Sequence, residues 1–340
     1  MPALVRTKSF LLACLFLLAF DTAAWDRGHV DRFATLPDGA AAPEGIAVDG
    51  NGNVYVSTFA TGAANTHNLY VFNSHGRLLK SFKVPGSSTQ LLGMAFHPTS
   101  GLLVVDFGGA KVFSVNPDTE EASTFATIPG GASAGPNALA FDAAGNVYIS
   151  DSFQGIIWRT PPAGVTATAW ATSDLLKTAG VPPFGANGLD FSGDHRVLFV
   201  ANTGNDTIVR IPVDPENGSA LTAAVFVNSV NGADGLFVDD EGNIWVCANQ
   251  ADEIVVIDPT GRVIAKLGDF EGVRRQAPVG LLFPASLVRH GNWVYVTNLS
   301  LDLRLFGLPQ AVDSQWAADV KRHTISRIRA RIPRVERGDD

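Results

Sequence analysis

Six similar stretches recur along the 340-residue chain. In each one, a turn leads into a short apolar strand, a tight hairpin and a second apolar strand. The stretches are PEGIAVDGNGNVYVS, LLGMAFHPTSGLLVVD, PNALAFDAAGNVYIS, ANGLDFSGDHRVLFVA, ADGLFVDDEGNIWVCA and PASLVRHGNWVYVTN. Their second residues are spaced 48, 45, 50, 47 and 51 positions apart. A repeat of this length with about four short strands per unit is typical of a β-propeller, in which each unit forms one blade of a ring.

Each unit continues past its hairpin into two further strands, as the alternation of apolar and polar residues indicates. In units one to five the third strand is predicted at NLYVFN, AKVFSVN, GIIWRTP, DTIVRIPV and DEIVVIDP, and the fourth at LLKSFKVP, STFATIP, TATAWAT, TAAVFVN and RVIAKLGD. Unit six has a predicted third strand at residues 323–331 but lacks a fourth, whereas residues 30–37, VDRFATLP, closely resemble STFATIP. We therefore predict an all-β, six-bladed propeller over residues 25–333, closed by the N-terminal strand. Such closure removes two exposed sheet edges.

The composition is that of a well-packed globular protein. Hydrophobic residues make up 46% of the chain, and its 34 glycines and 19 prolines suit many short strands joined by turns. Closed all-β architectures often exceed the length of an average domain, so one domain is expected. The formal net charge of −8 argues against a nucleic-acid partner, which would need a basic face.

The N-terminus has the features of a secretory signal peptide. Arg6 and Lys8 precede an apolar run over residues 10–20, and small residues at positions 22–24 offer a cleavage site. The run is short for a membrane span, so none is expected. We predict a leader at residues 1–24, a secreted or periplasmic protein, and a disordered tail at residues 334–340. Without the leader, Cys247 has no partner for a disulfide, and it is predicted to be a buried apolar residue.

Loop lengths differ between the two faces of the predicted propeller. Because successive strands run in opposite directions, the turns inside the first hairpins all lie on one face, and they are short. The long connections lie on the other face, at residues 58–67, 173–185, 270–283 and 299–322. Variable loops on a rigid scaffold are where binding sites are usually built. The last of these loops contains a predicted short helix at residues 314–321. This loop either caps the central opening or has no role in binding.

Four of the six equivalent positions carry oxygen-bearing side chains. The residues at these positions are Glu44, Leu92, Asn137, Asn187, Asp234 and Ala285. Equivalent positions in different blades converge on the propeller axis, so two carboxylates and two amides are expected to meet there. Such an all-oxygen set suits a hard divalent cation, with Ca²⁺ favoured over the strictly octahedral Mg²⁺, and the lack of His and Cys disfavours Zn²⁺. The alternative is that these are polar turn residues at strand starts, where Asn and Asp are common.

Over nearly all of the sequence after the leader, the chain resembles the senescence-marker-protein/gluconolactonase/luciferin-regenerating-enzyme family of six-bladed propellers. The residues that carry the resemblance are Glu44 in a P-E-G turn, Asn137 in G-P-N-A-L, Asn187 in A-N-G-L-D and Asp234 in A-D-G-L. In that family, as in the related diisopropylfluorophosphatases and paraoxonases, Glu, Asn, Asn and Asp in this order hold a catalytic divalent cation. The resemblance therefore implies that these four residues bind Ca²⁺, or another divalent cation such as Mg²⁺ or Mn²⁺.

The sequence departs from the family pattern at Gly135. Sugar-lactone members carry an arginine at this position, two residues before the first Asn, and that arginine helps to bind hydroxyl groups. Gluconolactone is therefore doubtful as the substrate. Apolar residues on the long-loop face also favour a small molecule that is less polar than a sugar lactone. They are Leu92, Phe153, Phe184, Leu282, Phe283, Leu305 and Phe306.

A cation on the axis would polarise a carbonyl or phosphoryl oxygen and stabilise the oxyanion that develops. Asp234 is predicted to be catalytic as well, either as a general base toward water or as a nucleophile, as its family counterpart is proposed to be. We therefore expect an exported, Ca²⁺-dependent hydrolase of lactones or esters. Two other functions fit the sequence. One is a non-catalytic NHL-like binding propeller with a structural cation, and the other is a metal-free protein similar to strictosidine synthase.

Other polar residues lie on the same face, at the ends of the second strands, and they either orient the ligands or cap turns. They are Ser57, Asp106, Asp151, Asn202, Asn249 and Asn298. His67, in a long loop, either transfers protons or is simply solvated. The histidines in hairpins of the opposite face are poor catalytic candidates: His97, His195 and His290. A nucleophilic Ser/His/Asp triad has no support in the sequence.

Overall fold

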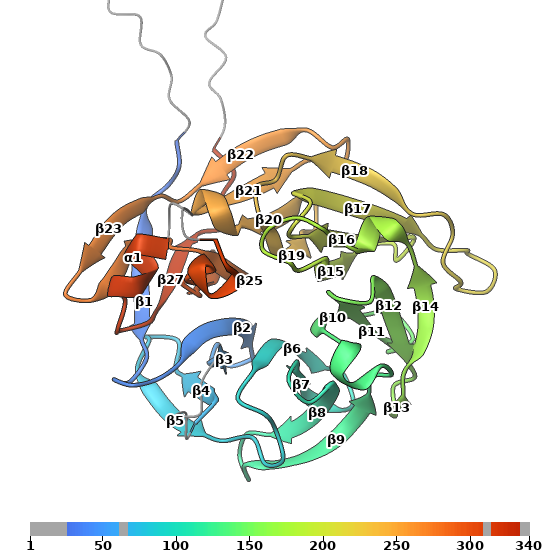
Figure 1. Ribbon diagram of the computed structural model, residues 1–340, viewed down its shortest axis with the longest axis horizontal. Helices are drawn as coiled ribbons and strands as arrows, with labels where there is room; N and C mark the ends of the chain where they lie inside the picture. Colours follow the sequence, from blue (N-terminus) through green and yellow to red (C-terminus); the bar gives the residue numbers. More distant parts are fainter. Residues whose placement is uncertain (1–25, 61–66, 309–313, 334–340) are drawn as a thin grey trace, which may run out of the picture.

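A computed structural model describes residues 26–60, 67–308 and 314–333. These residues form six blades around a central axis, and the first strand of each repeat lies innermost (Figure 1). The predicted six-bladed propeller is therefore confirmed. The predicted leader at residues 1–24 and the predicted tail at residues 334–340 lie outside the described residues.

Each blade contains the four strands that the repeat predicts. Blade one consists of β2 (Ala42–Val48), β3 (Val54–Phe59), β4 (Leu69–Phe72) and β5 (Leu78–Phe82). Blade two consists of β6 (Leu91–His97), β7 (Gly101–Asp106), β8 (Lys111–Asn116) and β9 (Glu121–Thr127). Blade three consists of β10 (Pro136–Phe141), β11 (Val147–Asp151), β12 (Ile156–Thr160) and β14 (Thr168–Thr172).

The other three blades follow the same order from the axis outward. Blade four consists of β15 (Ala186–Phe191), β16 (Val197–Asn202), β17 (Thr207–Pro212) and β18 (Ala224–Asn228). Blade five consists of β19 (Ala233–Val238), β20 (Ile244–Ala248), β21 (Glu253–Ile257) and β22 (Val263–Leu267). Blade six consists of β25 (Pro284–His290), β26 (Trp293–Asn298), β27 (Thr324–Arg329) and β1 (Val30–Thr35).

The N-terminal strand β1 closes the ring, as its likeness to a fourth strand predicts. It pairs antiparallel with β27, with one bulge after Arg32. Beyond the strand, the Leu36 N–H donates to the His323 carbonyl at 2.9 Å. Phe33 and Leu36 are buried among residues of blades one and six. The first and last parts of the propeller thus share one sheet and one core.

An ion pair ties the segment before β1 to blade five. Arg27 Nη2 lies 2.7 Å from Glu253 Oε2, and Arg27 Nε lies 2.6 Å from Asp269 Oδ1. The Arg27 carbonyl also accepts a hydrogen bond from the Gly268 N–H at 2.7 Å. The Glu253 side chain is only 6% exposed, and its other oxygen, Oε1, lies 2.7 Å from Lys266 Nζ. The buried charge is thus paired twice, and an unpaired buried charge would be strongly destabilising.

His323, at the start of β27, should make the closed ring sensitive to acid. Burial, and secondarily the charge of Lys321, lowers the pKa of His323 from 6.5 to about 4. The folded state thus disfavours the protonated ring, so this stability is present above pH 6.5 and is lost as the pH falls toward 4. In His323→Asn, the loss of unfolding free energy between pH 7 and pH 4 should be smaller than in the parent by on the order of 3 kcal/mol.

Urea unfolding at the two pH values measures this difference. The matched control is His75→Asn, because His75 is exposed. An equal pH dependence in the parent and in His323→Asn would show that His323 does not confer the acid sensitivity.

The inner strands approach one another closely around the axis. We call the six equivalent positions that include Glu44 and Asp234 the ring positions. The residue after each ring position is small in every blade: Gly45, Gly93, Ala138, Gly188, Gly235 and Ser286. A Cβ atom added at Gly93 would lie 2.8 Å from the Asn137 carbonyl oxygen, and one added at Gly235 would lie 2.7 Å from that of Ala285. The small size of these residues therefore lets the inner strands approach one another closely, which brings the ring side chains together.

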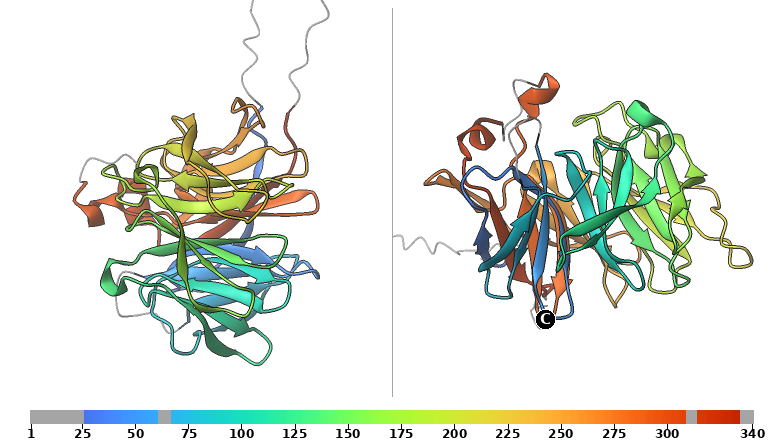
Figure 2. Two further views of the ribbon diagram at one scale, coloured as in Figure 1. Left: turned by 90° about the vertical axis from the view of Figure 1, so that its right-hand side faces the viewer. Right: turned by 90° about the horizontal axis from the view of Figure 1, so that it is seen from below.

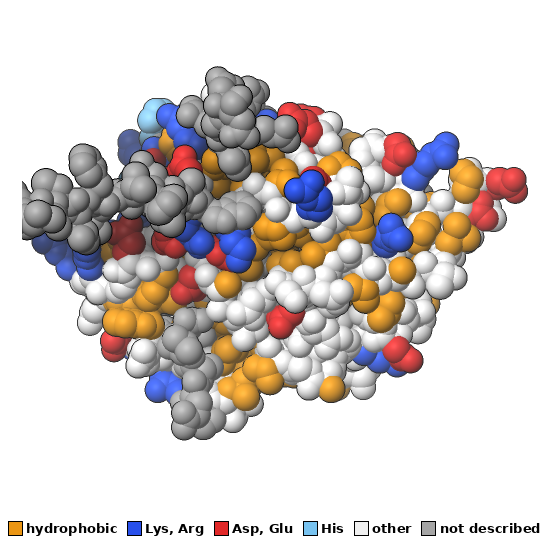
Figure 3. All heavy atoms as spheres, turned by 90° about the horizontal axis from the view of Figure 1, so that it is seen from above, with side chains coloured by type: hydrophobic (Ala, Val, Ile, Leu, Met, Phe, Trp, Pro, Cys, Tyr) orange, Lys and Arg blue, Asp and Glu red, His pale blue; other side chains and the backbone are white. Residues whose placement is uncertain are grey.

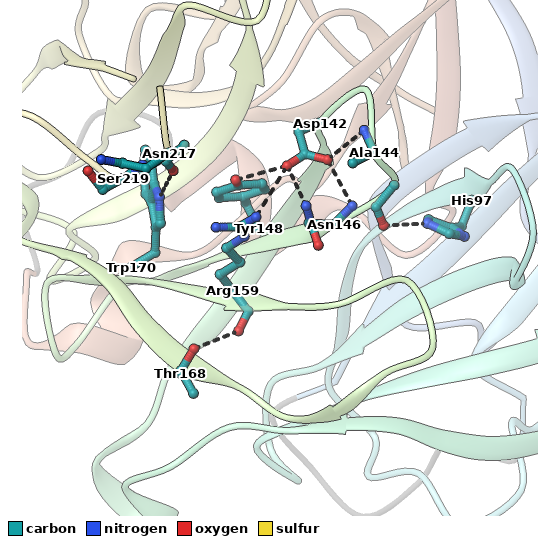
Figure 4. Close-up of polar contacts among 12 residues, drawn as sticks. His97, Asp142, Ala144, Asn146, Tyr148, Arg159, Thr168, Trp170, Asn217 and Ser219 are labelled. Carbon is teal, nitrogen blue, oxygen red and sulfur yellow. Dashed lines mark hydrogen bonds and ion pairs between the residues drawn. The ribbon is translucent and has the colours of Figure 1, made fainter. Parts of the chain in front are cut away.

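On the face opposite the long loops, the hairpins of blades one, three and five are built around an aspartate. In blade three, the Asp142 carboxylate accepts hydrogen bonds from the Asn146 amide at 2.7 Å and from the Tyr148 hydroxyl at 3.0 Å (Figure 4). His97 Nε2 lies 2.8 Å from a backbone carbonyl of this turn, so it links blade two to blade three. The equivalent aspartates of blades one and five are Asp49 and Asp239. These contacts hold the scaffold together.

Some local elements differ from the predicted ones. β13 (Val165–Thr166) pairs parallel with β9 and gives blade two a fifth strand. The predicted long loop at residues 270–283 contains a hairpin of β23 (Phe270–Arg274) and β24 (Ala277–Gly280). The predicted helix is present as α1 (Ser314–Asp319). It packs on this hairpin, with the rings of Trp316 and Phe270 5.7 Å apart, and lies away from the axis (Figure 1).

Short helical turns complete the long-loop face (Figure 2). They are the 3₁₀ turns η1 (Gly131–Ser133), η2 (Asp174–Leu176), η3 (Asn249–Ala251) and η4 (Leu303–Phe306). Among the residues that the structure describes, no helix combines the length and the apolar character needed to cross a membrane.

Candidate active site on the propeller axis

A small cavity opens on the axis. Its polar lining consists of Glu44, Asn137, Asn187, Thr203, Asp234 and Asn249. Its apolar lining consists of Phe59, Leu92, Pro182, Phe184, Phe283, Leu299 and Leu301. The structure therefore brings all four oxygen-bearing ring residues into one cavity. Two carboxylates at the base of a mostly apolar cavity are an arrangement typical of ligand sites.

The two remaining ring positions behave differently from each other. Leu92 lines the cavity, whereas Ala285 is fully buried and does not reach it. Phe283, Leu299 and Leu301 form an apolar cluster with Ala285 and line the cavity in its place. The first part of the blade-six insertion thus contributes to the cavity, although its helix does not.

Hydroxyl groups orient the two ring amides. Asn137 Nδ2 donates to Ser152 Oγ at 3.2 Å, and Asn187 Nδ2 donates to Thr203 Oγ1 at 2.9 Å. The two hydroxyls donate in turn to backbone carbonyls of the next blade, at 2.7 and 2.8 Å. Because the amide nitrogens are bound to these hydroxyls, the opposite ends of both amides, which are the carbonyl oxygens, are free to act as ligands in the cavity.

The two ring carboxylates are buried and only partly hydrogen-bonded. Glu44 and Asp234 are each 4% exposed. Asp234 Oδ2 accepts a hydrogen bond from Asn249 Nδ2 at 2.9 Å. Within the described residues, Glu44 Oε2, Asp234 Oδ1 and Asn249 Oδ1 have no hydrogen-bond partner. Buried polar atoms are nearly always paired, so three such oxygens around one cavity indicate a site for a positively charged ligand.

Burial raises the pKa of both ring carboxylates. Burial raises the pKa of Glu44 well above its usual value, and the neighbouring Asp234 carboxylate raises it further. Burial also raises the pKa of Asp234 to about 7, against the opposing effect of hydrogen bonds from Asn249, Asn187 and the Gly235 N–H. The ionised pair is therefore costly without a counterion.

The donor set fits a hard divalent cation. No group of three or more His, Cys, Asp or Glu side chains in the described part of the chain is placed to hold a metal ion. A cation on the axis would therefore depend on Glu44, Asp234 and the amide oxygens of Asn137 and Asn187. Carboxylate and amide oxygens in a flexible geometry are the ligands that Ca²⁺ takes.

The polar residues at the ends of the second strands have divided roles. Asn249 contacts a ring carboxylate, and Ser57 accepts a hydrogen bond from the Gly45 N–H at 2.9 Å beside the ring. The others bond the backbone of nearby loops and turns: Asp106, Asp151, Asn202 and Asn298. The amide-orienting hydroxyls of Ser152 and Thr203 come one residue later in the chain. Their signal in the sequence is a Ser or Thr directly after the strand end, in the blades whose ring residue is Asn.

None of the histidines considered above lines the cavity. His67 Nδ1 lies 2.9 Å from the Ser81 hydroxyl in an exposed position. Cys247 is a free, fully buried thiol, as predicted. Burial raises the pKa of Cys247 well above its usual value, and the Asp234 and Glu44 carboxylates add to this shift. It is therefore packed as an apolar residue and is not a reactive thiolate.

Replacing Glu44 with glutamine should change stability in opposite directions with and without Ca²⁺. In chelator-treated protein the change removes a buried charge whose burial costs several kcal/mol, so the melting temperature should rise. In the parent, Ca²⁺ at a hundredfold excess over its Kd should add about 3 kcal/mol of stability, and the variant should lose this gain. Thermal melting with EDTA and with Ca²⁺ measures both effects.

The matched control for this test is Glu241→Gln, because Glu241 is exposed on the opposite face. It should respond to Ca²⁺ as the parent does. If Glu44→Gln also gained as much stability from Ca²⁺ as the parent, Glu44 would not be a ligand.

Residues 87–268, more than half of the chain, match the SMP-30/Gluconolactonase/LRE-like region. The matched range contains Asn137, Asn187 and Asp234, whereas Glu44 precedes it. No curated protein sequence matches the chain significantly.

Solved structures of similar proteins share the fold. A luciferin-regenerating enzyme superposes with a TM-score of 0.63 at 15% identity, covering 88% of this chain and 95% of its own. A gluconolactonase from Xanthomonas campestris gives 0.61 at 15% identity, with 89% and 91% covered. Regucalcin from Agrobacterium tumefaciens gives 0.59 at 17% identity, with 91% and 97% covered. At these identities the likeness shows the six-bladed fold. The sequence match over residues 87–268 shows, in addition, that this chain belongs to the SMP-30/gluconolactonase/LRE-like family.

Proposed function

We propose that this protein is a hydrolase of lactones or esters that depends on a divalent cation, with Ca²⁺ as the first choice and Mg²⁺ or Mn²⁺ as alternatives. The observation that carries the proposal is the group of unpaired oxygens on Glu44, Asp234 and Asn249 at the base of an open cavity. Membership of a family that includes gluconolactonases supports the reaction type. Regucalcin, which shares the fold, is described as a calcium-binding protein, and this supports the cation.

In this mechanism the ring residues hold the cation and position the substrate. Glu44, Asn137, Asn187 and Asp234 would be its ligands, and a bound cation supplies Lewis acidity toward a substrate carbonyl oxygen and the oxyanion formed from it. Asp234 Oδ1, which has no hydrogen-bond partner in the described part of the chain, is the atom available to take a proton from water or to attack the carbonyl carbon. The Asn249 amide fixes the other oxygen of that carboxylate at 2.9 Å, so Asp234 is held in one orientation.

Apolar side chains in the cavity favour the same reaction. Phe59, Phe184 and Leu299 line the cavity together with the carboxylates, so a bound substrate would displace water from the site. Electrostatic interactions with the reacting carbonyl are stronger in such a low-dielectric site. The sequence of residues 1–24 supports the further proposal that the protein acts outside the cytoplasm.

A substrate panel tests the proposed function. Lactones with five- and six-membered rings, aryl esters and phosphotriesters should be assayed with Ca²⁺ present, and turnover of lactones or esters is expected. If Ca²⁺ raises the melting temperature but no compound is turned over, the protein is a binding propeller with a structural cation. If Ca²⁺ has no effect and purified protein contains no metal, a metal-free protein is the better description.

A further inference from the structure

We infer that the substrate carries a flat aromatic group, which binds against a wall of three phenylalanine rings beside the carboxylates. The inference rests on the proposed function and names the substrate class that this site would take. The wall consists of Phe107, Phe153 and Phe184. We call these three residues the aromatic wall.

The aromatic wall is a continuous surface built from three different blades. Phe153 and Phe184 are stacked, with their ring centroids 5.8 Å apart and their planes 17° apart. Phe107 meets both rings edge-on, at 5.3 Å from Phe153 and 6.2 Å from Phe184. Phe59 and Phe306 extend the surface at its two ends, at 6.3 Å from Phe107 and 5.6 Å from Phe184. Phe184 and Phe59 also line the cavity itself, so the wall runs directly into the site.

Gly135 makes room for the aromatic wall. A Cβ atom added at Gly135 would lie 2.8 Å from two ring carbons of Phe153 and 3.3 Å from Phe107 Cε2. Gly135 has no positive φ angle that would itself require glycine. Glycine is needed here because a side chain would clash with the two phenyl rings. The space that a side chain at position 135 would fill is thus occupied by two phenyl rings.

Hydrogen bonds hold Phe153 in this place. The Asp151 carboxylate accepts from the Gly135 N–H at 3.0 Å and from the Phe153 N–H at 3.1 Å. The Ser152 N–H donates to the Gly135 carbonyl at 2.8 Å. These bonds fix the strand end that carries Phe153 against the segment that carries Gly135. The wall is therefore pre-organised, and binding of a ligand ring would cost the protein little conformational entropy.

Exposure of Phe153 shows that the wall has a free surface. The Phe153 side chain is 45% exposed although it touches two other rings. Hydrophobic side chains also appear on the side of the molecule drawn in Figure 3, so exposure alone is not distinctive. The distinctive feature is that this surface adjoins a cavity whose base carries two carboxylates. A small molecule with an apolar ring at one end and a reactive carbonyl at the other fits both parts, and aromatic rings pair well with each other in stacked or edge-on geometry.

A matched pair of lactones tests the inference. γ-Butyrolactone and γ-phenyl-γ-butyrolactone share the reacting ring and differ in the phenyl group. The parent should show a higher kcat/KM for the phenyl compound, by about tenfold or more, which is the range that apolar pocket contacts provide. In Phe153→Ala this ratio should fall about tenfold, mainly through KM, because the contact exists before and during the reaction. Gly135→Arg should lower the ratio as well, because the arginine displaces Phe153.

Two further variants serve as checks. Leu221→Ala removes a side chain that is 49% exposed outside the cavity, and it should leave the ratio at the parental value. Phe153→Leu keeps an apolar side chain but removes the ring, and should lie between the parent and Phe153→Ala. If Phe153→Ala does not fold, Phe153→Leu serves as the test variant in its place.

Failure of the inference and failure of the proposed function are distinguishable. Hydrolysis of both lactones with no preference for the phenyl compound would overturn the aromatic wall as a specificity surface and leave the hydrolase standing. If neither lactone is hydrolysed, calorimetric binding of the non-reactive ketone 2-phenylcyclopentanone decides. Tighter binding to the parent than to Phe153→Ala would support the wall, and equal binding would overturn it.

Discussion

Replacing Asp234 with asparagine should lower kcat/KM for lactone hydrolysis by about a thousandfold or more, since the change removes a negatively charged ligand and the proposed base or nucleophile together. Asparagine has nearly the same shape as aspartate, and its carbonyl oxygen can still accept the 2.9 Å hydrogen bond from Asn249. The fold should therefore be kept. Without Ca²⁺ the variant should even be more stable, because a buried carboxylate is gone. Steady-state kinetics and thermal melting of the same sample measure both effects.

The control for this experiment is Asp240→Asn, an exposed aspartate in a hairpin of the opposite face. It should retain parental kinetics. Retention of more than about a tenth of the parental kcat/KM by Asp234→Asn would contradict a direct role of this carboxylate, because loss of one catalytic group commonly costs at least a hundredfold.

A chain that begins at Asp38 should aggregate or melt markedly lower than one that begins at Trp25. The shorter chain loses β1 and so exposes the edge of β27, which is a template for aggregation. It also removes Phe33 and Leu36 from the core between blades one and six. Loss of two such buried side chains alone costs about 5 kcal/mol or more. Removal of Arg27 leaves the buried Glu253 without one of its two ion-pair partners.

Thermal melting and size-exclusion chromatography of the two chains measure this effect. Equal melting temperatures and equal monomer content would show that β1 contributes little to closure. A chain with Arg27→Ala alone separates the ion pair from the strand. Because that ion pair is partly exposed on the arginine side, this variant should lose only a small part of the stability that the Asp38 chain loses.

The blade pattern was predictable because all six units repeat the same arrangement of apolar strands and turns. Glu44, Asn137, Asn187 and Asp234 could be aligned from the sequence alone, and the structure places all four at one cavity. The closing strand could be predicted for the same reason, since VDRFATLP repeats the apolar alternation of STFATIP. Strand period and repeat length are local signals, and the ring follows from them.

Features that depend on contacts between blades could not be predicted in the same way. The β23–β24 hairpin turns at Arg275 and Gln276, both with positive φ angles of 51° and 63°. Hairpin turns of this kind usually carry Asn or Gly, so the sequence gives no turn signal there. Phe107 comes directly after β7 and resembles an ordinary strand-end residue until the fold places it beside Phe153. Likewise Ser152 and Thr203 acquire their role only because each lies next to a ring amide.

The most direct test of the cation-dependent hydrolase is removal and return of the metal, with metal content and turnover measured on the same samples. Chelator-treated protein should contain no divalent cation by elemental analysis and should not hydrolyse lactones. Titration with Ca²⁺ should restore turnover in proportion to bound metal, up to one cation per chain, and the Glu44→Gln variant should bind far less. Mg²⁺ and Mn²⁺ titrations identify which cation supports turnover best. Full lactone hydrolysis by protein that holds no metal would contradict the account.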